Sequence, residues 1–177
     1  VLLSRYSHET DIVVGSPIAG RAHRDLEQLI GFFGNTLVLR SDLSGNLPFV
    51  ELLRSSQQTI HDAYAHQHVP FEMLVEELKP ERSLSHSPLF QILFVLQNME
   101  MGDVARLGGS ALEWVGEGSG IVKFDLELNV LEREGALVLH WWYKRDLFSA
   151  ETIERMASNF EVLLAGLLER PEERVQA

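Results

Sequence analysis

Histidine is the residue type in this sequence that most readily suggests metal binding or proton transfer. The 177-residue chain has seven histidines, and three of them lie in "HDAYAHQH", residues 61–68. His61 and His66 are five positions apart, whereas two imidazoles share a helix face at a separation of four, as in H-E-x-x-H, a pattern absent here. The histidines are therefore typical of a solvated helix end, and no metal site is predicted.

Other patterns of covalent or acid–base chemistry are also missing. "GSPIAG" (15–20) comes closest to the nucleophile elbow G-x-S-x-G but has the wrong spacing. The glycines of 102–120 lack the strand, helix and lysine of a phosphate loop. Carboxylates in "EMLVEEL" and "PEER" are typical of solvated helix faces. The aromatic run 141–143 could stack a ligand, but its place in an alternating strand favours a core role. The residues alone predict no catalytic set.

One polar residue stands in an apolar setting. In "LIGFFGNTLVLR" (29–40), Asn35 lies between Phe33 and the run Leu37-Val38-Leu39. A buried amide without hydrogen-bond partners costs about 1–3 kcal/mol. Asn35 therefore either fixes a turn or faces a cavity.

Apolar periodicity and turn residues predict an α/β domain of about six strands and four helices that positions these residues. Gly15-Ser16-Pro17 is expected to end the first strand, and Gly34 the first helix. Pro48 and Pro70 suit first helical turns. The expected strands are 11–14, 35–43, 87–98, 112–115, 123–134 and 136–146, and the expected helices are 23–33, 47–67, 69–80 and 149–170.

Apolar stripes predict which faces are buried. The run 87–98 is expected to be covered on both faces, and the glycine-rich residues 99–121 are expected to form a long excursion. Ser149 is expected to cap the last helix, and Pro171 to end it. The stripes are Phe124, Leu126, Leu128 and Val130 in one strand, then Phe49, Leu53, Ile60 and Tyr64, then Phe71, Leu74, Val75 and Leu78, and finally Ile153, Met156, Phe160, Leu163, Leu164 and Leu167.

Composition limits the class of protein. With 45% hydrophobic and 23% charged residues, the chain is typical of one soluble globular domain, and no apolar run reaches the roughly 18 residues of a membrane span. The absence of cysteine excludes disulfides and thiolate metal sites and is compatible with the cytoplasm. A net charge of −11 argues against nucleic-acid binding. We therefore expect a cytoplasmic domain that binds neither membranes nor nucleic acids.

Three strings resemble, in order, core motifs of nonribosomal peptide synthetase condensation domains. "IGFFGNTLVLR" (30–40) is similar to I-G-x-F-V-N-T-x-x-x-R, "HQHVPFE" (66–72) to H-Q-D-x-P-F-E, and "RSLSHSPLF" (82–90) to R-x-x-S-x-N-P-L-F. "DIVVGSPIAGR" and "DLFSAETIERM" also resemble that family, so the likeness covers nearly the whole chain. The departures are Gly34 for valine, His68 for aspartate and Ser87 for asparagine.

The resemblance implies a chloramphenicol-acetyltransferase-like lobe with a mixed, largely antiparallel sheet. The family's active-site motif, H-H-x-x-x-D-G, belongs to an N-terminal lobe, and this sequence has no His-His pair. The resemblance therefore implies that residues 1–177 are the C-terminal lobe, inactive alone, with 99–121 reaching toward the N-terminal lobe across the reaction channel. The implied partners are that N-terminal lobe, an adenylation domain, and donor and acceptor carrier proteins that bear phosphopantetheine arms.

Asn35, Ser16 and Thr36 are the candidates that the resemblance places along the channel. Asn35 would hydrogen-bond the pantetheine arm or an acyl carbonyl; alternatively, Asn35 and Thr36 only fix the helix-to-strand turn. Ser16 would donate to a developing oxyanion. Arg21 and Arg40 are expected to form structural ion pairs. The other motif residues are expected to be architectural: Gly31, Phe33, Pro70, Phe71, Glu72, Arg82, Ser85 and Pro88.

Other activities stay open at this point. A non-catalytic condensation-like domain would recruit a tailoring enzyme, an epimerising or heterocyclising relative would act on the same carriers, and an acyltransferase of the same fold would use CoA. The strings "GNT" and "PFE" favour ordinary condensation.

Overall fold

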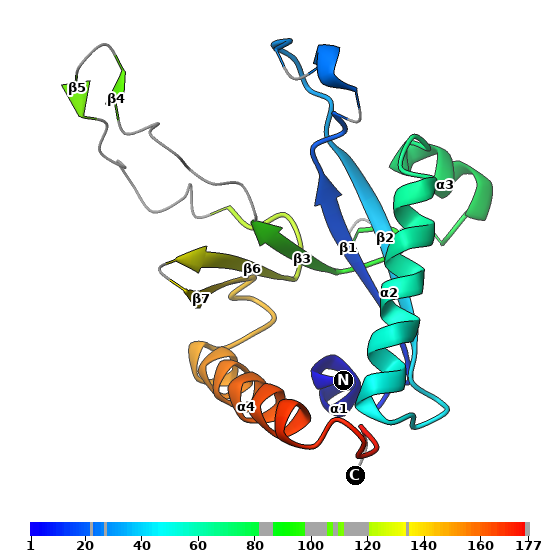
Figure 1. Ribbon diagram of the computed structural model, residues 1–177, viewed down its shortest axis with the longest axis vertical. Helices are drawn as coiled ribbons and strands as arrows, with labels where there is room; N and C mark the ends of the chain where they lie inside the picture. The colour runs from blue at the N-terminus through cyan, green and yellow to red at the C-terminus, as the bar shows by residue number, and fades with distance from the viewer. Residues whose placement is uncertain are drawn as a thin grey trace.

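A five-stranded sheet, flanked by helices, organises the chain in the computed structural model (Figure 1), in the order β2-β1-β3-β6-β7. The structure describes residues 1–21, 23–26, 28–81, 87–97, 106–107, 110–111, 121–133 and 135–175. The strands are β1 (Asp11–Ile18), β2 (Asn35–Asp42), β3 (Ile92–Gln97), β6 (Leu126–Arg133) and β7 (Ala136–Tyr143), with β4 (Arg106–Leu107) and β5 (Ser110–Ala111) forming a separate pair. The helices are α1 (Leu2–Ser7), α2 (Phe49–Ala65), α3 (Phe71–Leu78) and α4 (Ala150–Glu169), with one 3-10 turn, η1 (Arg24–Leu26).

The mixed, largely antiparallel sheet agrees with the prediction, and its two parallel pairings lie at the centre of the sheet. β1–β2 and β6–β7 pair antiparallel, whereas β1–β3 and β3–β6 pair parallel. Each antiparallel pair joins strands that are close in sequence, whereas the parallel pairs need long crossovers, which strand periodicity does not reveal. The strand predicted at 112–115 and most of the predicted excursion 99–121 lie outside the described residues.

The half of the sheet beside α4 follows the predicted pattern. Leu126, Leu128 and Val130 are buried at alternate positions of β6, and Leu126 packs against Ile153 and Met156 of α4. The Ser149 hydroxyl accepts a hydrogen bond from the Thr152 N–H at 3.2 Å, as expected of a helix cap. Periodicity and capping therefore located this half correctly.

The half beside α2 is packed differently from the prediction. The predicted stripe on α2 is largely wrong, because Leu53, Ile60 and Tyr64 are 55%, 40% and 47% exposed. Leu52 is the buried position, in a cluster with Leu43 and Val175. The segment after α4 crosses the start of α2, where the Val175 N–H donates to the Leu47 carbonyl. The start of α2 thus contributes Leu52 to a core that a distant segment completes.

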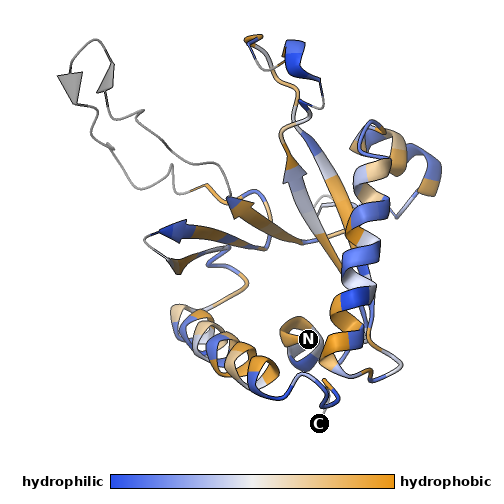
Figure 2. Ribbon diagram, in the orientation of Figure 1, coloured by the Kyte–Doolittle hydropathy of each residue, from blue (hydrophilic) through white to orange (hydrophobic). Residues whose placement is uncertain are grey.

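The predicted helix at 23–33 is wrong. Among the described residues of this range, only η1 is helical, and the segment between β1 and β2 extends beyond the sheet with an apolar tip (Figures 1 and 2). Ile30 and Phe32 are almost fully exposed. Helical spacing needs a surface to pack against, because isolated helices shorter than about 12–15 residues are marginal in water. Within the described structure, this segment has no such surface.

Two further predictions of burial are also wrong. β3 is not covered on both faces, since Phe94 and Leu96 are 36% and 57% exposed while Leu93 is buried. Leu78, at the end of α3, is 63% exposed. Alternate side chains of a strand face opposite sides, so the outer half of one face of β3 is uncovered in the described structure.

Candidate functional site

Ser16 lies on a strand, not in the tight loop that the sequence predicts. β1 continues through Gly15-Ser16-Pro17 and pairs with β2 along its whole length. With β3, Gly15 and Leu93 form the one paired position among the described residues, and the two strands then diverge (Figure 1). Pro17 has no N–H to donate to a ladder, which is why proline is confined to unpaired strand edges. The β1–β3 ladder is therefore expected to end near Pro17.

The hydroxyl of Ser16 is chemically available. Ser16 is half-buried, and within the part of the chain that the structure describes, its hydroxyl has no hydrogen-bond partner. Gly15 and Leu93 share one face of the sheet, so Ser16 and Phe94 share the other. Ser16 thus stands next to the uncovered half of β3.

The side-chain amide of Asn35 is saturated by main-chain groups. Its Nδ2 donates to the carbonyl oxygens of Gln67 at 3.0 Å and Val69 at 2.8 Å. Its Oδ1 accepts from the N–H groups of Phe71 at 3.1 Å and Thr36 at 2.8 Å. An Asn amide offers two donor hydrogens and two acceptor lone pairs, and all four are used. Of the two alternatives that the sequence left open, this geometry favours the fixing of a turn.

Three aromatic rings connect the "HQHVPFE" and "SPLF" strings. The Phe71 ring meets Phe90 edge-on, with centroids 5.6 Å apart, and Phe90 stacks on Phe124 at 5.2 Å. Phe90 is 2% exposed and lies against Gly15, where an added Cβ would sit 2.2 Å from the ring. Gly15 was not predicted as a packing residue; a glycine inside a strand is the signal for such a close approach.

A tight turn delivers Phe90 to this position. Leu89 has a φ of 67°, and the Phe90 N–H donates to the Pro88 carbonyl at 2.8 Å across it. A left-handed conformation is uncommon for a bulky residue, so the burial of Phe90 must offset its cost. The architectural role predicted for Pro88 and Phe71 agrees with these contacts.

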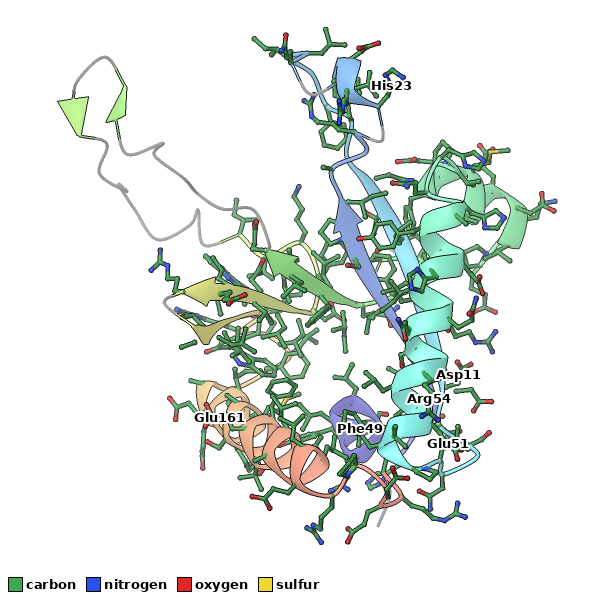
Figure 3. The ribbon with its side chains drawn as sticks, in the orientation of Figure 1. Asp11, His23, Phe49, Glu51, Arg54 and Glu161 are labelled. Carbon is green, nitrogen blue, oxygen red and sulfur yellow. The ribbon has the colours of Figure 1, made fainter. Side chains whose placement is uncertain are left out.

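Arg40 forms the structural ion pair that was predicted. Its Nε and Nη2 donate to the two carboxylate oxygens of Asp11, each at 2.8 Å, and this hydrogen bonding holds the pKa of Asp11 below its usual value. The pKa of Asp42 is also lowered, because its carboxylate accepts from Ser44. Figure 3 shows Asp11 at the base of the β1–β2 hairpin and His23 near its tip. The ion pair therefore braces the end of the hairpin remote from Ser16.

Arg21 forms no ion pair with the residues that the structure describes, contrary to the prediction. It donates to the carbonyls of Leu26 and Gly31, and its guanidinium lies 4.6 Å from the centre of the Phe33 ring. Irregular main chain leaves carbonyls unpaired, and a guanidinium satisfies several at once. Gly31 and Phe33 therefore have a structural role, since both contact Arg21 and help to fix the conformation of this segment.

The remaining predicted residues are structural or lie outside the described residues. Pro70 directly precedes α3, and Glu72 lies exposed in its first turn, where the helix dipole favours a carboxylate. Arg82 and Ser85 are outside the described residues. In the described ranges, no group of three or more metal-ligating side chains is gathered. Across the same ranges, no helix is both long and apolar enough to cross a membrane.

Comparison with known proteins assigns the class. A profile of the condensation domain family matches residues 1–177, and the chain belongs to this family. A linear gramicidin synthase subunit of Brevibacillus parabrevis is 53% identical over 173 residues, which is 97% of this chain and 2% of that protein. A plipastatin synthase subunit of Bacillus subtilis (strain 168) is 45% identical over 170 residues, 96% of this chain and 5% of that protein. The chain thus spans a small part of these relatives.

Solved structures show the same fold. A four-domain nonribosomal peptide synthetase, holo-AB3403 bound to AMP and glycine, matches with a TM-score of 0.88 and 25% identity over 98% of this chain and 14% of that chain. The X-domain from teicoplanin biosynthesis matches with a TM-score of 0.85 and 29% identity over 99% of this chain and 40% of that chain. The X-domain has also been solved in complex with OxyB, where the TM-score is 0.79 and the identity 28% over 99% of this chain and 39% of that chain. These matches confirm the chloramphenicol-acetyltransferase-like fold that the sequence motifs implied.

Proposed function

We propose that this chain is the C-terminal lobe of a condensation domain that forms peptide bonds in a nonribosomal peptide synthetase. The observation that carries the proposal is the family match over all 177 residues, together with 53% identity to a linear gramicidin synthase subunit. The chain corresponds to 40% of the solved X-domain chain and has no His-His pair. An N-terminal lobe with H-H-x-x-x-D-G would supply the rest, and this lobe alone is inactive.

In the proposed reaction, an acceptor amine attacks the thioester carbonyl of a donor acyl or peptidyl group. A C–N bond forms, the C–S bond breaks, and the donor thiol leaves with a proton while the product stays on the acceptor. Ser16 donates a hydrogen bond to the carbonyl oxygen as it becomes negative. Its half-buried place and unpartnered hydroxyl support this role.

The proposed partners follow from that reaction. Both thioesters are held on phosphopantetheine arms of carrier proteins, so this lobe binds no cofactor of its own. An adjacent adenylation domain loads the acceptor carrier, and the uncovered face of β3 beside Ser16 forms channel wall. Thr36 pairs with Pro17, so its side chain lies on the opposite face of the sheet from Ser16, and it is not assigned to this wall. The proposed location is the cytoplasm.

The test uses the intact condensation domain containing these residues, with loaded donor and acceptor carriers and product detection by mass spectrometry. Ser16→Ala is expected to lower kcat by about 10²-fold, the usual effect of losing one oxyanion donor. Ser158→Ala, which removes an exposed hydroxyl from α4, serves as the matched control. Full turnover by the Ser16 variant would contradict the role of Ser16. No product from the wild type with cognate carriers would contradict condensation itself.

Recruitment of another enzyme is the second candidate function, because the X-domain is a structural relative and has been solved in complex with OxyB. The higher identity to the gramicidin synthase subunit favours condensation. An intact domain that makes no peptide bond but binds a purified tailoring enzyme would reverse this preference.

A further inference from the structure

We infer that Asn35 is a positioning residue, which caps α3 from the neighbouring strand and thereby holds Ser16 in place; this role rests on the proposed function. The first N–H groups of a helix have no partner inside the helix, and α3 receives no side-chain cap from the residue that precedes it, Pro70. The Asn35 Oδ1 accepts the hydrogen bond of the first of these groups, the Phe71 N–H. β2 therefore supplies the cap that α3 lacks.

The same amide also holds the approach to the helix. The carbonyls of Gln67 and Val69 belong to the turn between α2 and α3, and both accept from Asn35 Nδ2. A single side chain at the first residue of β2 thus fixes three main-chain groups of one turn. Because every donor and acceptor of the amide is occupied, Asn35 has no capacity left for a pantetheine arm or an acyl carbonyl.

Two routes of contact lead from Asn35 to either side of Ser16. Along the sheet, Asn35 pairs with Ile18, two residues beyond Ser16. Through the side chains, the capped residue Phe71 contacts Phe90, and Phe90 fills the space over Gly15, directly before Ser16. Displacement of the turn would therefore shift the main chain on both sides of the Ser16 hydroxyl.

The experiment compares wild type with Asn35→Ala in the intact domain, and uses Asn159→Ala as a matched control. The amide of Asn159, in α4, also makes a hydrogen bond, to the hydroxyl of Tyr6, but this bond is exposed to solvent. Substrates are carrier-bound thioesters and N-acetylcysteamine thioesters, which retain only the end of the pantetheine arm. Amide hydrogen exchange and Tm are measured on the same samples.

Asn35→Ala is expected to lower kcat per folded molecule by about ten- to a hundredfold, as misplacement of a catalytic group does. The factor is expected to be the same for both substrate types, with KM unchanged. Faster exchange at the Phe71 N–H and a Tm lower by about 2–4 °C should accompany it. The control should match wild type in kcat and in exchange at Phe71.

A second change provides the rescue. Pro70 has extended dihedrals at the N-cap position of α3, so Pro70→Asp in the Asn35→Ala background gives the helix its own cap. We expect this double variant to recover part of both Tm and kcat. Rescue of turnover has no explanation if Asn35 acts by touching the substrate.

Three outcomes are distinguishable. A raised KM for carrier-bound substrate alone, with normal Tm and exchange, would overturn the inference in favour of channel contact. Lower Tm with unchanged kcat per folded molecule would overturn positioning and leave a purely structural cap. Absence of product from the wild type would defeat the proposed function; exchange at Phe71 in Asn35→Ala would then still decide whether Asn35 caps α3.

Discussion

The two antiparallel hairpins of this lobe, β1–β2 and β6–β7, have strands of equal length but are stabilised in different ways. All their strands have eight residues, paired throughout. β6–β7 packs on α4 through a regular apolar face. β1–β2 carries the candidate site and connects its strands through the projecting segment 19–34. In addition to apolar packing at its base, it has individual close contacts: Asn35 to a turn, Gly15 to Phe90, and Arg40 to Asp11.

The two hairpins are therefore expected to differ in their sensitivity to substitution. Burial of apolar area stabilises whatever side chains of suitable size fill it, so the β6–β7 half tolerates gradual change. Close contacts and hydrogen bonds with fixed geometry fail abruptly when one atom is added or lost. The hairpin with the candidate site is therefore the more sensitive to small substitutions, and the variants below test that contrast.

Gly15→Leu should have the largest effect. Even the Cβ would lie 2.2 Å from the Phe90 ring, and overpacking of a buried site costs about 1–3 kcal/mol or more. We expect a loss near or above about 3 kcal/mol, seen as a lower denaturant midpoint or as failure to yield folded protein. Gly166→Ala is the control, because nothing lies within 4 Å of a Cβ there; in α4 it should stabilise by about 0.5–1 kcal/mol. A Gly15→Leu variant with wild-type stability would remove the contrast between the hairpins.

Leu126→Ala tests the regular half. Leu126 is 2% exposed and packs against Ile153 and Met156, so the cavity should cost about 2–5 kcal/mol. kcat per folded molecule should nevertheless stay near wild type, because β6 lies on the side of β3 away from Ser16. Urea titration and turnover on one preparation separate the two quantities. A drop in kcat as large as that of Asn35→Ala would show that the hairpins are coupled.

Ser149→Ala should have a moderate effect on the same half. The variant removes the hydroxyl that accepts from the Thr152 N–H, and loss of such a cap costs about 1 kcal/mol. Ser158→Ala, inside α4, removes a hydroxyl that bonds a carbonyl one turn back and should be close to neutral. Thermal unfolding of both variants is the measurement. Equal shifts in Tm for the two would contradict the capping role.

The regular half was predictable because its signals are local. The alternation of Leu126, Leu128 and Val130, the cap at Ser149 and the stripe on α4 each follow from neighbours a few positions apart. The helix predicted at 23–33 failed although its apolar spacing is real, since spacing does not show whether a surface exists for packing. The prediction of the buried face of α2 was wrong for a similar reason, because Val175 completes the core there from the far end of the chain.

The candidate site was predictable only in part. Family motifs pointed to Asn35 and Ser16, and the cost of a buried amide correctly posed two alternatives for Asn35. Its partners at 67–71 lie 32 or more positions away in sequence, so no local rule could choose between those alternatives. Gly15 and Phe90 are likewise distant in sequence: a glycine inside a strand signals a close approach but does not show which residue makes it.

Arg40→Met should have the smallest effect and a defined pH dependence. Arg40 lowers the pKa of Asp11 in the folded state, so the pair stabilises the fold above the ordinary Asp pKa of about 3.9. That contribution is lost as the pH falls through the lowered pKa of Asp11.

The Tm of wild type should thus exceed that of Arg40→Met at neutral pH, and the difference in Tm should disappear in strong acid. Both side chains are largely exposed, so salt should shrink this difference. Arg155→Met, which removes the same charge from α4, controls for net charge. A difference in Tm that persists in acid would mean that Arg40 stabilises the hairpin by packing of its aliphatic stem and not by pairing with Asp11. This end of β1–β2 would then be stabilised by packing, as β6–β7 is, and the contrast between the two hairpins would be smaller.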